Sequence, residues 1–435
     1  MKKLLVLSLA VVMVVAFTLP ASAFESVFGG YWRTRAYSQQ SFNGDDNPGS
    51  DISRVDTRTR LYYTAILNDN LKFINQFETN VEWGDNVGGD AGADGTGIIR
   101  VRASYVDATM GAIRATIGIQ PWEQARGFIF SDQVSGIVLS TKFGETLVPF
   151  SWTKQSEGNV GVTDFNPKDI DVLSLYPVFN FGESFSLNPF IVFAYSDHGE
   201  ENSTNPLSTY GANAAFPGAF RNNDGLNVYW IGANADATLG AFNLWATAIY
   251  QGGELKTDDN GVDNIDVKAW LAAVGASVPL GPASLHGQFF YASGDDDADD
   301  DDFEAFFGID GRARGWSYYW AEIMGNGRFD SQLSAGSTAN PSNLWAANIG
   351  ATIKPMEKLS LTGDLWYAAH PEDDFTTDEK NLGVEVDLVA TYQLVEGMSI
   401  DLVGAYLFAD DATATDDNGN KEDPWEVGTR LQISF

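Results

Sequence analysis

The chain has no cysteine and three histidines, so catalysis that depends on either residue finds little support in the sequence. Without cysteine there are no disulfides, no thiolate nucleophiles and no cysteine-bound metals. His198 and His370 fall in expected loops, and His286 lies alone on an expected strand. The sequence has no Gly-x-Ser-x-Gly elbow, phosphate-binding loop or metal-spaced histidine pair. We therefore do not expect an enzyme, because a working histidine would need a partner elsewhere in the fold.

Basic residues are also scarce. The sequence has 26 Lys and Arg against 59 Asp and Glu, for a net charge of −33. Nucleic-acid binding needs Lys and Arg to meet the phosphates, so this balance argues against it. An acidic surface attracts cations instead.

Long apolar runs are limited to one, at the N-terminus. Lys2 and Lys3 precede the run Leu4–Leu19, and Ala21-Ser22-Ala23 follows it. A basic start, a short apolar core and an A-x-A site predict a signal peptide cleaved after Ala23. The alternative, a membrane helix, would need about 20 apolar residues. Cleavage leaves residues 24–435, with 24 basic and 59 acidic residues and a net charge of −35.

What remains is rich in aromatics and glycine and alternates apolar with polar residues at period two, which predicts strands. The 12 Trp, 16 Tyr, 28 Phe and 44 Gly fit an all-β chain. We count 18 such runs, at residues 27–39, 53–67, 71–83, 98–109, 112–120, 133–143, 146–156, 169–180, 185–196, 226–238, 241–251, 264–278, 283–293, 343–354, 359–369, 381–394, 398–408 and 425–435.

The connections between these runs are alternately short and long. Short turns such as Asn68-Asp69-Asn70 and Met110-Gly111 take turns with loops such as 84–97 and 294–342. That alternation is typical of a transmembrane antiparallel up-and-down β-barrel with short periplasmic turns and long extracellular loops. We predict a single barrel domain over 24–435 with about 18 strands. Sixteen strands remain open as an alternative.

The last run, 425–435, ends the chain on an aromatic residue. Leu431, Ile433 and Phe435 share its apolar face. This pattern resembles the C-terminal signal by which bacterial outer-membrane proteins are recognised for barrel insertion. The barrel-assembly machinery is therefore an expected partner.

Parity along the strands assigns an outer and an inner face. In the second strand Val55 and Leu61 point to lipid, while Arg58 and Arg60 point inward. A charged residue at the lipid midplane costs about 2–4 kcal/mol for Arg or Lys, which forbids the opposite register. We therefore expect a polar, charged interior around an aqueous lumen.

Inward arginines cluster on the first five strands, because nine of the 14 arginines lie between residues 33 and 126. Parity predicts a pore-lining basic wall of Arg33, Arg35, Arg54, Arg58, Arg60, Arg100, Arg102 and Arg114. It predicts pore-lining acids on the last strands at Asp364, Glu385, Asp387, Asp401 and Glu426. The two sets either impose a transverse field that selects solutes or form ion pairs that stiffen the wall. The two interpretations are compatible.

The loop at about 294–342 combines seven aspartates in residues 295–302 with a dense set of aromatics. Loops of this length are often functional. We expect it to fold inward as a constriction or lid formed by Phe306, Phe307, Trp316, Tyr318, Tyr319 and Trp320. A small extracellular cap with its own core is the alternative.

Acidic loops supply weak calcium candidates at Asp258, Asp263, Asp416 and Asn418, because calcium prefers oxygen ligands. None of them has EF-hand spacing. We expect no cofactor beyond loosely bound divalent cations, which could bridge the outer loops to lipopolysaccharide and other outer-membrane lipid.

The signal peptide, the strand pattern and the terminal Phe435 together resemble Gram-negative outer-membrane porins. Asp56-Thr57-Arg58-Thr59-Arg60-Leu61, followed by the Asn68-Asp69-Asn70 turn, resembles alginate-export-like barrels of 18 strands. In that family inward arginines guide a polyanion, and the positions that match here are Arg58 and Arg60. The resemblance implies an outer-membrane channel.

We predict a porin of the Gram-negative outer membrane that conducts small hydrophilic solutes and ions passively, with selectivity set by the basic wall and the long loop. Two alternatives stay open: an export channel for an anionic polysaccharide, and a non-conducting barrel that displays its loops. A homotrimer is a further expectation, since porins of this kind are often trimers.

Overall fold

The computed structural model of the protein describes residues 24–44, 51–84, 99–156, 170–197, 223–257, 264–297, 300–309, 321–331, 333, 341–373, 379–414 and 421–435. The predicted signal peptide lies outside these residues. No helix in the described ranges is long and apolar enough to cross a membrane.

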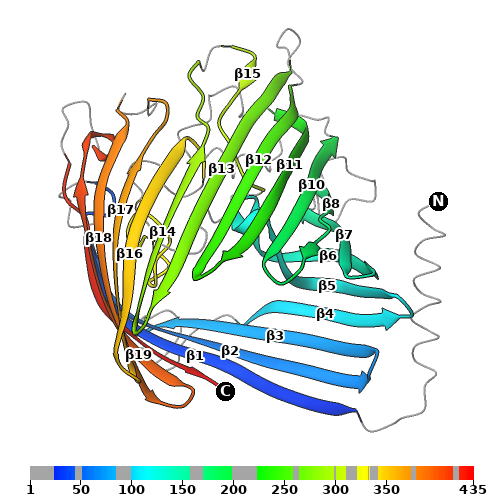
Figure 1. Ribbon diagram of the computed structural model, residues 1–435, viewed down its shortest axis with the longest axis horizontal. Coiled ribbons are helices and arrows are strands. Elements are labelled where there is room, and N and C mark those ends of the chain that lie inside the picture. Colours follow the sequence, from blue (N-terminus) through cyan, green and yellow to red (C-terminus); the bar gives the residue numbers. More distant parts are fainter. Residues whose placement is uncertain are drawn as a thin grey trace.

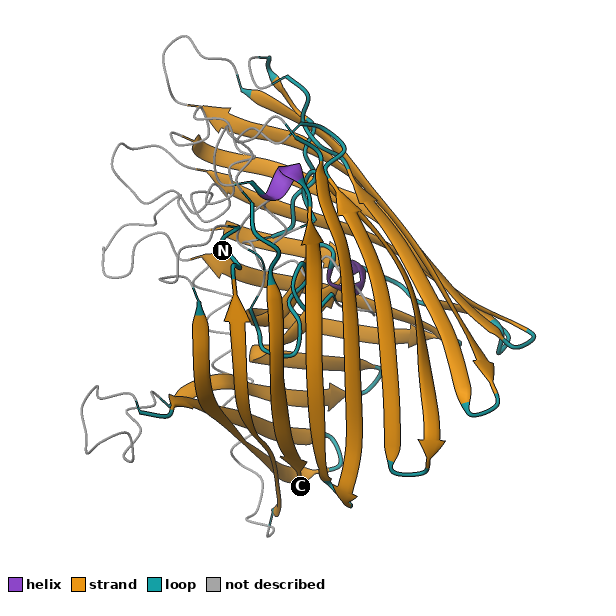
Figure 2. Ribbon diagram, turned by 90° about the vertical axis from the view of Figure 1, so that its left-hand side faces the viewer, coloured by secondary structure: helices purple, strands orange, loops and turns teal. Residues whose placement is uncertain are grey.

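Strands dominate the described chain (Figures 1 and 2). They are β1 (Glu25–Gln40), β2 (Ile52–Asn68), β3 (Leu71–Glu82), β4 (Arg100–Met110), β5 (Ile113–Gln124), β6 (Phe130–Phe143), β7 (Thr146–Ser156), β8 (Ile170–Leu175), β9 (Phe179–Phe181), β10 (Phe185–Asp197), β11 (Asn223–Leu239), β12 (Phe242–Thr257), β13 (Ile265–Leu280), β14 (Ala283–Ala292), β15 (Asp302–Phe303), β16 (Leu344–Met356), β17 (Leu359–Ala369), β18 (Asn381–Val395), β19 (Met398–Ala409) and β20 (Trp425–Ser434). Two 3-10 turns, η2 (Ala125–Gly127) and η6 (Asp411–Thr413), accompany them.

These strands form one closed antiparallel barrel, since β1 pairs with both β2 and β20. Figure 1 shows the blue first strand and the C-terminus lying together where the sheet closes. Closure pairs the first and last wall strands of the described barrel with each other, as the hydrocarbon core requires.

The described barrel has 18 wall strands, as the sequence predicts. β8 and β9 both pair with β10 and act as one interrupted strand. The gap between them contains Pro177, which has no N–H for the ladder. The Asn188 side chain donates instead to the carbonyls of Tyr176 and Pro177, at 3.0 and 2.9 Å. β15 pairs in parallel with β13 and belongs to the long loop, not to the wall.

Short turns join neighbouring strands at one end of the barrel, where Figure 2 shows them as tight connections. Gly111 and Gly240 have φ near +63° in these turns, a conformation that glycine adopts without steric penalty. The predicted alternation of short turns and long connections therefore has a local basis in the turn residues.

The outer face carries exposed large apolar side chains on nearly every strand, including Leu61, Val274 and Leu388. Their alternates on the same strands point into the barrel. On β13 the inward residues Ile265, Val267 and Leu271 are buried, while Trp270 is exposed. An apolar exterior is what a bilayer-facing barrel requires.

The interior is not polar throughout, so the sequence-based expectation is wrong for β6 to β14. Buried apolar residues from most of these strands form one hydrophobic core with residues from two inward-folded loops and with inward residues of β16 to β19 such as Trp366 and Leu407, and we call this core the packed half. Phe128 contacts Phe290 with ring centroids 5.9 Å apart, and the backbone N–H of Ile309 donates to the Ile129 carbonyl at 2.8 Å. The loops thus fill that side of the barrel.

Candidate functional site

The basic wall is assembled by the register of the first strands. Arg33 on β1 lies opposite Arg58 on β2, and Arg35 lies opposite Asp56. Arg58 and Arg60 in turn lie opposite Asn80 and Glu78 on β3. Because side chains alternate along a strand, these residues share the inner face. Guanidinium groups from adjacent strands therefore meet inside the barrel.

Acids from neighbouring strands stabilise this concentration of positive charge. Asp56 accepts hydrogen bonds from Arg35 Nε and Nη2 at 2.9 and 2.6 Å. Glu78 is 3% exposed and lies 2.7 Å from Arg60, 3.5 Å from Arg102 and 3.9 Å from Arg58. The bidentate contact of Arg35 with Asp56 is the strong form of the arginine–carboxylate interaction. The wall is thus a network of ion pairs with a surplus of arginine.

The remaining members of the wall lie toward its edges. Arg54 pairs with Glu82 at 3.5 Å, and Arg114 binds Asp107 through two hydrogen bonds of 2.8 and 2.9 Å. Arg100 is exposed at the start of β4, opposite Glu78 in register. The function of the wall stays a prediction.

A loop carboxylate that sequence reasoning missed sits on the wall. Asp330 Oδ2 forms ion pairs with Arg33, with Arg35 at 3.2 Å and with Arg58 at 3.2 Å. Burial of Asp330 favours its neutral form, but the three guanidinium groups outweigh that effect and hold the pKa of its carboxyl below the usual range. No sequence signal pointed to it, because its partners are almost 300 residues away.

The segment that carries Asp330, residues 321–331, docks on the inner face of β18, β20 and β1. Glu385 accepts hydrogen bonds from the backbone N–H groups of Ile323 and Met324, both at 2.8 Å. Phe329 stacks on Tyr37 with ring centroids 4.6 Å apart. Part of the long loop therefore lies inside the barrel, against the wall.

The predicted acids lie on the inner face and each has a polar contact. Asp387 accepts from the backbone of Glu322 at 3.3 Å, and Asp401 binds Arg430 at 2.7 Å. Glu426 on β20 accepts a hydrogen bond from the Gln39 side chain on β1 at 2.8 Å, where the barrel closes. Its partner across the closure is thus an amide and not an arginine. Asp364 on β17 lies 2.7 Å from Nε2 of His286 on β14, so this histidine has an acidic partner on another strand.

Two of the aromatics predicted to form a lid, Phe306 and Phe307, are described, and both belong to the packed half. Phe306 is fully buried, and Phe307 is held at both backbone atoms, since its N–H donates to Gln251 and its carbonyl accepts from Trp230, each at 3.0 Å. Trp316, Tyr318, Tyr319 and Trp320 lie outside the described residues. The two phenylalanines are therefore core residues of the inward fold, and their role as a constriction or lid stays a prediction.

A second inward loop was also missed. Ala125, Arg126 and Gly127 all have positive φ, a tight reversal that turns the chain back into the barrel. Arg126 binds Asp236 at 2.9 Å and lies 5.4 Å from the Trp245 ring centroid. The available signal was the apolar run Phe128-Ile129-Phe130 in the long connection between the expected strands at 112–120 and 133–143.

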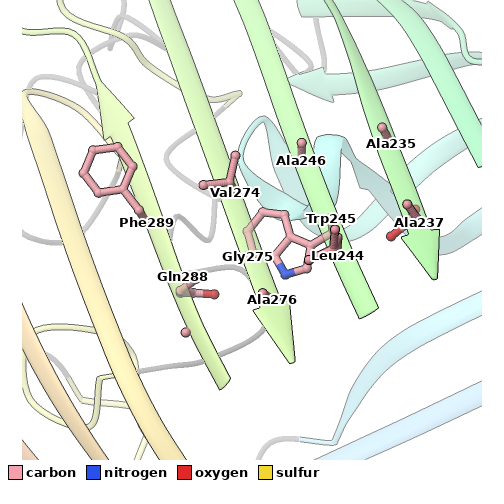
Figure 3. A pocket seen from close by; sticks show the side chains of 12 residues that line it. Ala235, Ala237, Leu244, Trp245, Ala246, Val274, Gly275, Ala276, Gln288 and Phe289 are labelled. Atoms are coloured by element: carbon pink, nitrogen blue, oxygen red, sulfur yellow. The ribbon is translucent and has the colours of Figure 1, made fainter. Parts of the chain in front are cut away.

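Two recesses adjoin this contact. One, of about 600 Å³, lies in the wall of β11 to β14 (Figure 3). Its lining residues are Ala235, Asp236, Ala237, Leu244, Trp245, Ala246, Val274, Gly275, Ala276, Gly287, Gln288 and Phe289. The other, of about 670 Å³, is more polar and extends to the turn at Gly182-Glu183. Neither is lined by a residue of the basic wall.

The C-terminal residues complete the closure. Leu431 and Ile433 lie opposite Thr34 and Trp32, and Phe435 exchanges backbone hydrogen bonds with Gly30. Their role as an insertion signal stays a prediction. The calcium candidates Asp258, Asp263, Asp416 and Asn418 lie outside the described residues. Within the described ranges, no group of three or more His, Asp or Glu side chains is placed to hold a metal ion.

No family model matches the chain, and no curated protein matches it in sequence. Solved structures do resemble it. OccAB4 of Acinetobacter baumannii has a TM-score of 0.58 at 11% identity, covering 96% of this chain and 100% of that one. A BenF-like porin from Pseudomonas fluorescens Pf-5 has a TM-score of 0.55 at 10% identity, covering 94% and 99%. OpdK of Pseudomonas aeruginosa, solved with vanillate, has a TM-score of 0.56 at 10% identity, covering 94% and 98%.

These likenesses span nearly the whole of both chains, so they establish the fold, which is that of Gram-negative outer-membrane porins. They lend no support to the alginate-export-like resemblance, which rested on a short stretch around Arg58 and Arg60.

Proposed function

We propose that the chain, which has the outer-membrane porin fold, forms a channel for passive diffusion of small hydrophilic solutes across the outer membrane of a Gram-negative bacterium. The observation that carries the proposal is the basic wall, a line of arginines on adjacent strands inside a closed barrel. Burying so many charges would be costly in a barrel that served only as a scaffold. Arginines that line a water-filled passage keep much of their hydration, and there they can interact with passing solutes.

The short turns would face the periplasm and the long loops the exterior, as in other outer-membrane barrels. The driving force is the solute's own gradient, because the chain has no nucleotide-binding motif. The protein would act by discrimination alone, through the width of the passage and the charges along it.

The favoured solutes are small organic anions. Arg33, Arg35, Arg58 and Arg60 present guanidinium groups that match carboxylate geometry. OpdK, which shares the fold, was solved with vanillate, an organic carboxylate. This likeness supports the solute class without naming the natural solute.

Swelling of proteoliposomes tests the proposal. Vesicles that contain the refolded barrel are diluted into isosmotic arabinose, lysine hydrochloride or sodium benzoate, with protein-free vesicles as the control. We expect swelling in all three solutes, fastest in benzoate. Swelling no faster than in protein-free vesicles would overturn the channel function.

A non-conducting display barrel is the second candidate, favoured by one observation. The packed half fills one side of the interior with buried apolar side chains. If loop segments also closed the other side, the barrel would be plugged. Absence of swelling in all solutes would favour this candidate.

The remaining proposals concern how the barrel is inserted into the membrane, what its loops contact and whether it forms a trimer. The apolar face of the last strand, with Leu431, Ile433 and Phe435, would be bound by the barrel-assembly machinery, and the acidic outer loops would contact lipopolysaccharide through divalent cations. A homotrimer would appear as three equal closing steps in single-channel recordings.

A further inference from the structure

The contact between Asp330 and the basic wall has the form of a bound ligand. A single oxygen, Oδ2, collects ion pairs from Arg33, Arg35 and Arg58, which come from two strands. Three donors converging on one anionic oxygen is the arrangement that a protein uses to hold an oxyanion. Here the oxyanion comes from the protein's own loop.

The arginines have hydrogen-bond donors that Asp330 does not occupy. Arg33 Nε is buried and has no hydrogen-bond partner among the described residues. A charged donor that is buried and unsatisfied is costly, so this Nε–H is available to an added acceptor. A free carboxylate, which is not restrained by a backbone, could place its second oxygen on such a donor.

Asp330 stands between the arginines and the lumen. Its side chain is 38% exposed, whereas those of Arg33 and Arg35 are 6% exposed. A solute that reaches this part of the wall therefore meets Asp330 first. The aspartate reduces the positive charge that the solute would experience.

The contacts that hold the loop in place are not made by the Asp330 side chain. Phe329 is buried on Tyr37, and the Arg328 carbonyl accepts from Arg35 at 3.1 Å, so the loop is held by the residues before Asp330. Rotation of the Asp330 side chain would free the arginines without undocking the loop. Rotamer changes of exposed side chains take picoseconds to nanoseconds, so the rotation itself is fast once the ion pairs open.

We propose that Arg33, Arg35 and Arg58 form a binding site for a solute carboxylate, and that Asp330 occupies it as a tethered competitor. A passing carboxylate displaces the Asp330 side chain and is displaced by it in turn. Tight binding of solute would slow its exit, so a built-in competitor keeps the site weak and transport fast. This inference rests on the proposed channel function and adds a residue that sets the affinity of its site.

The test is Asp330→Asn. Asp330 has φ +55°, and asparagine tolerates this left-handed conformation better than other non-glycine residues, so the substitution removes the charge with little backbone strain. Asp302→Asn is the matched control, because Asp302 lies in the same loop, is 34% exposed and pairs with Lys268 away from the wall. Asp330→Gly is a second variant that suits the same φ.

Binding of benzoate to the detergent-solubilised barrel is measured by calorimetry, and benzoate block is measured in single-channel recordings. Asp330→Asn should lower the dissociation constant about tenfold, a difference of about 1.4 kcal/mol. It should also lower the half-blocking concentration and prolong each block. Asp302→Asn should match the unchanged protein in both measurements.

Equal benzoate affinity in the unchanged protein, Asp330→Asn and Asp330→Gly would overturn the inference. So would an increase in open conductance without tighter binding, since that indicates only a loosened loop. If the unchanged barrel does not conduct but Asp330→Asn still binds benzoate more tightly, the competitor role stands and the channel function fails. Conduction without an affinity change would leave the channel function standing and overturn the competitor role.

Discussion

The two sides of the barrel interior use the same strand geometry for opposite purposes. On β1 to β5 the inward positions carry arginines and their acidic partners, and a loop touches them through Asp330. On β6 to β14 most strands place buried apolar residues inward beside uncharged polar ones such as Ser151 and Gln251, and two loops pack against them. Both sides present apolar residues to the outside. The residue types on the outer face are therefore those that suit a membrane. The residue types on the inner face differ between regions, according to whether a loop packs on them or water covers them.

The largest expected effect is on the packed half. Trp230→Ala removes a fully buried indole together with its 3.0 Å hydrogen bond to Phe307, and should lower the free energy of unfolding by about 3–5 kcal/mol. Urea unfolding in lipid vesicles measures it. Trp270→Ala, on the outer face nearby, is the control and should cost less, because its side chain is 46% exposed and its loss leaves no enclosed cavity in the core. Equal losses would contradict a core inside the barrel.

Replacing Glu78 should affect stability less than Trp230→Ala does, but it should affect ion selectivity more. Glu78→Gln leaves Arg58, Arg60 and Arg102 without their shared acid and should destabilise the barrel by about 1–2 kcal/mol, a value reduced for the partial exposure of these arginines. Reversal potentials in a salt gradient should shift toward anions. Glu82→Gln, whose residue is 48% exposed and 3.5 Å from Arg54, should change both quantities little. A cation-directed shift in Glu78→Gln would contradict the wall's role.

The two regions should respond oppositely to pH. The pKa of Asp330 is depressed, so its stabilisation is present above the unfolded value of about 3.9 and is lost only as pH falls through the lower folded value. Burial raises the pKa of Asp295, in the loop after β14, to about 6, so ionising it destabilises the fold as pH rises through that value.

Unfolding free energies at pH 4.5 and pH 8 measure this contrast. Asp295→Asn should stabilise the barrel more at pH 8 than at pH 4.5. Asp330→Asn should destabilise it by a similar amount at both values. Two variants that shift stability in the same direction would show that the environments do not differ as described.

The smallest expected effect is at the edge of the basic wall. Arg114 is bidentate to Asp107 but well exposed near the short-turn end, where solvent screens the pair. Arg114→Gln should change stability by less than about 1 kcal/mol and leave selectivity nearly unchanged. A large selectivity change would extend the functional part of the wall to that end.

The sequence was sufficient to predict the features that depend on local alternation. The 18 wall strands, their short turns and the shared face of Arg33, Arg35, Arg58 and Arg60 all follow from parity. Each is set by neighbours a few residues away or on the adjacent strand. Sequence reasoning could therefore place these four arginines on one face, while their pore-lining role stays a prediction.

Sequence reasoning missed the features that depend on contacts between residues far apart in the chain. The period-two alternation along a strand does not reveal such contacts. Asp330 meets Arg33 across 297 positions of sequence, and Arg126 meets Asp236 across 110. The packed half did leave a signal, because β13 carries apolar residues on both faces, as expected when both faces are covered. Which loops cover it could not be predicted, since that is decided by three-dimensional packing.

The role of the basic wall in ion passage can be measured as the reversal potential of single channels in a potassium chloride gradient. The unchanged barrel is compared with Arg33→Gln/Arg58→Gln and with Arg114→Gln. We expect anion preference in the unchanged barrel, loss of most of it in the double variant, and retention in Arg114→Gln. Steady conductance with the same reversal potential in all three would show that ions do not pass along the basic wall, and would contradict its proposed role in selectivity.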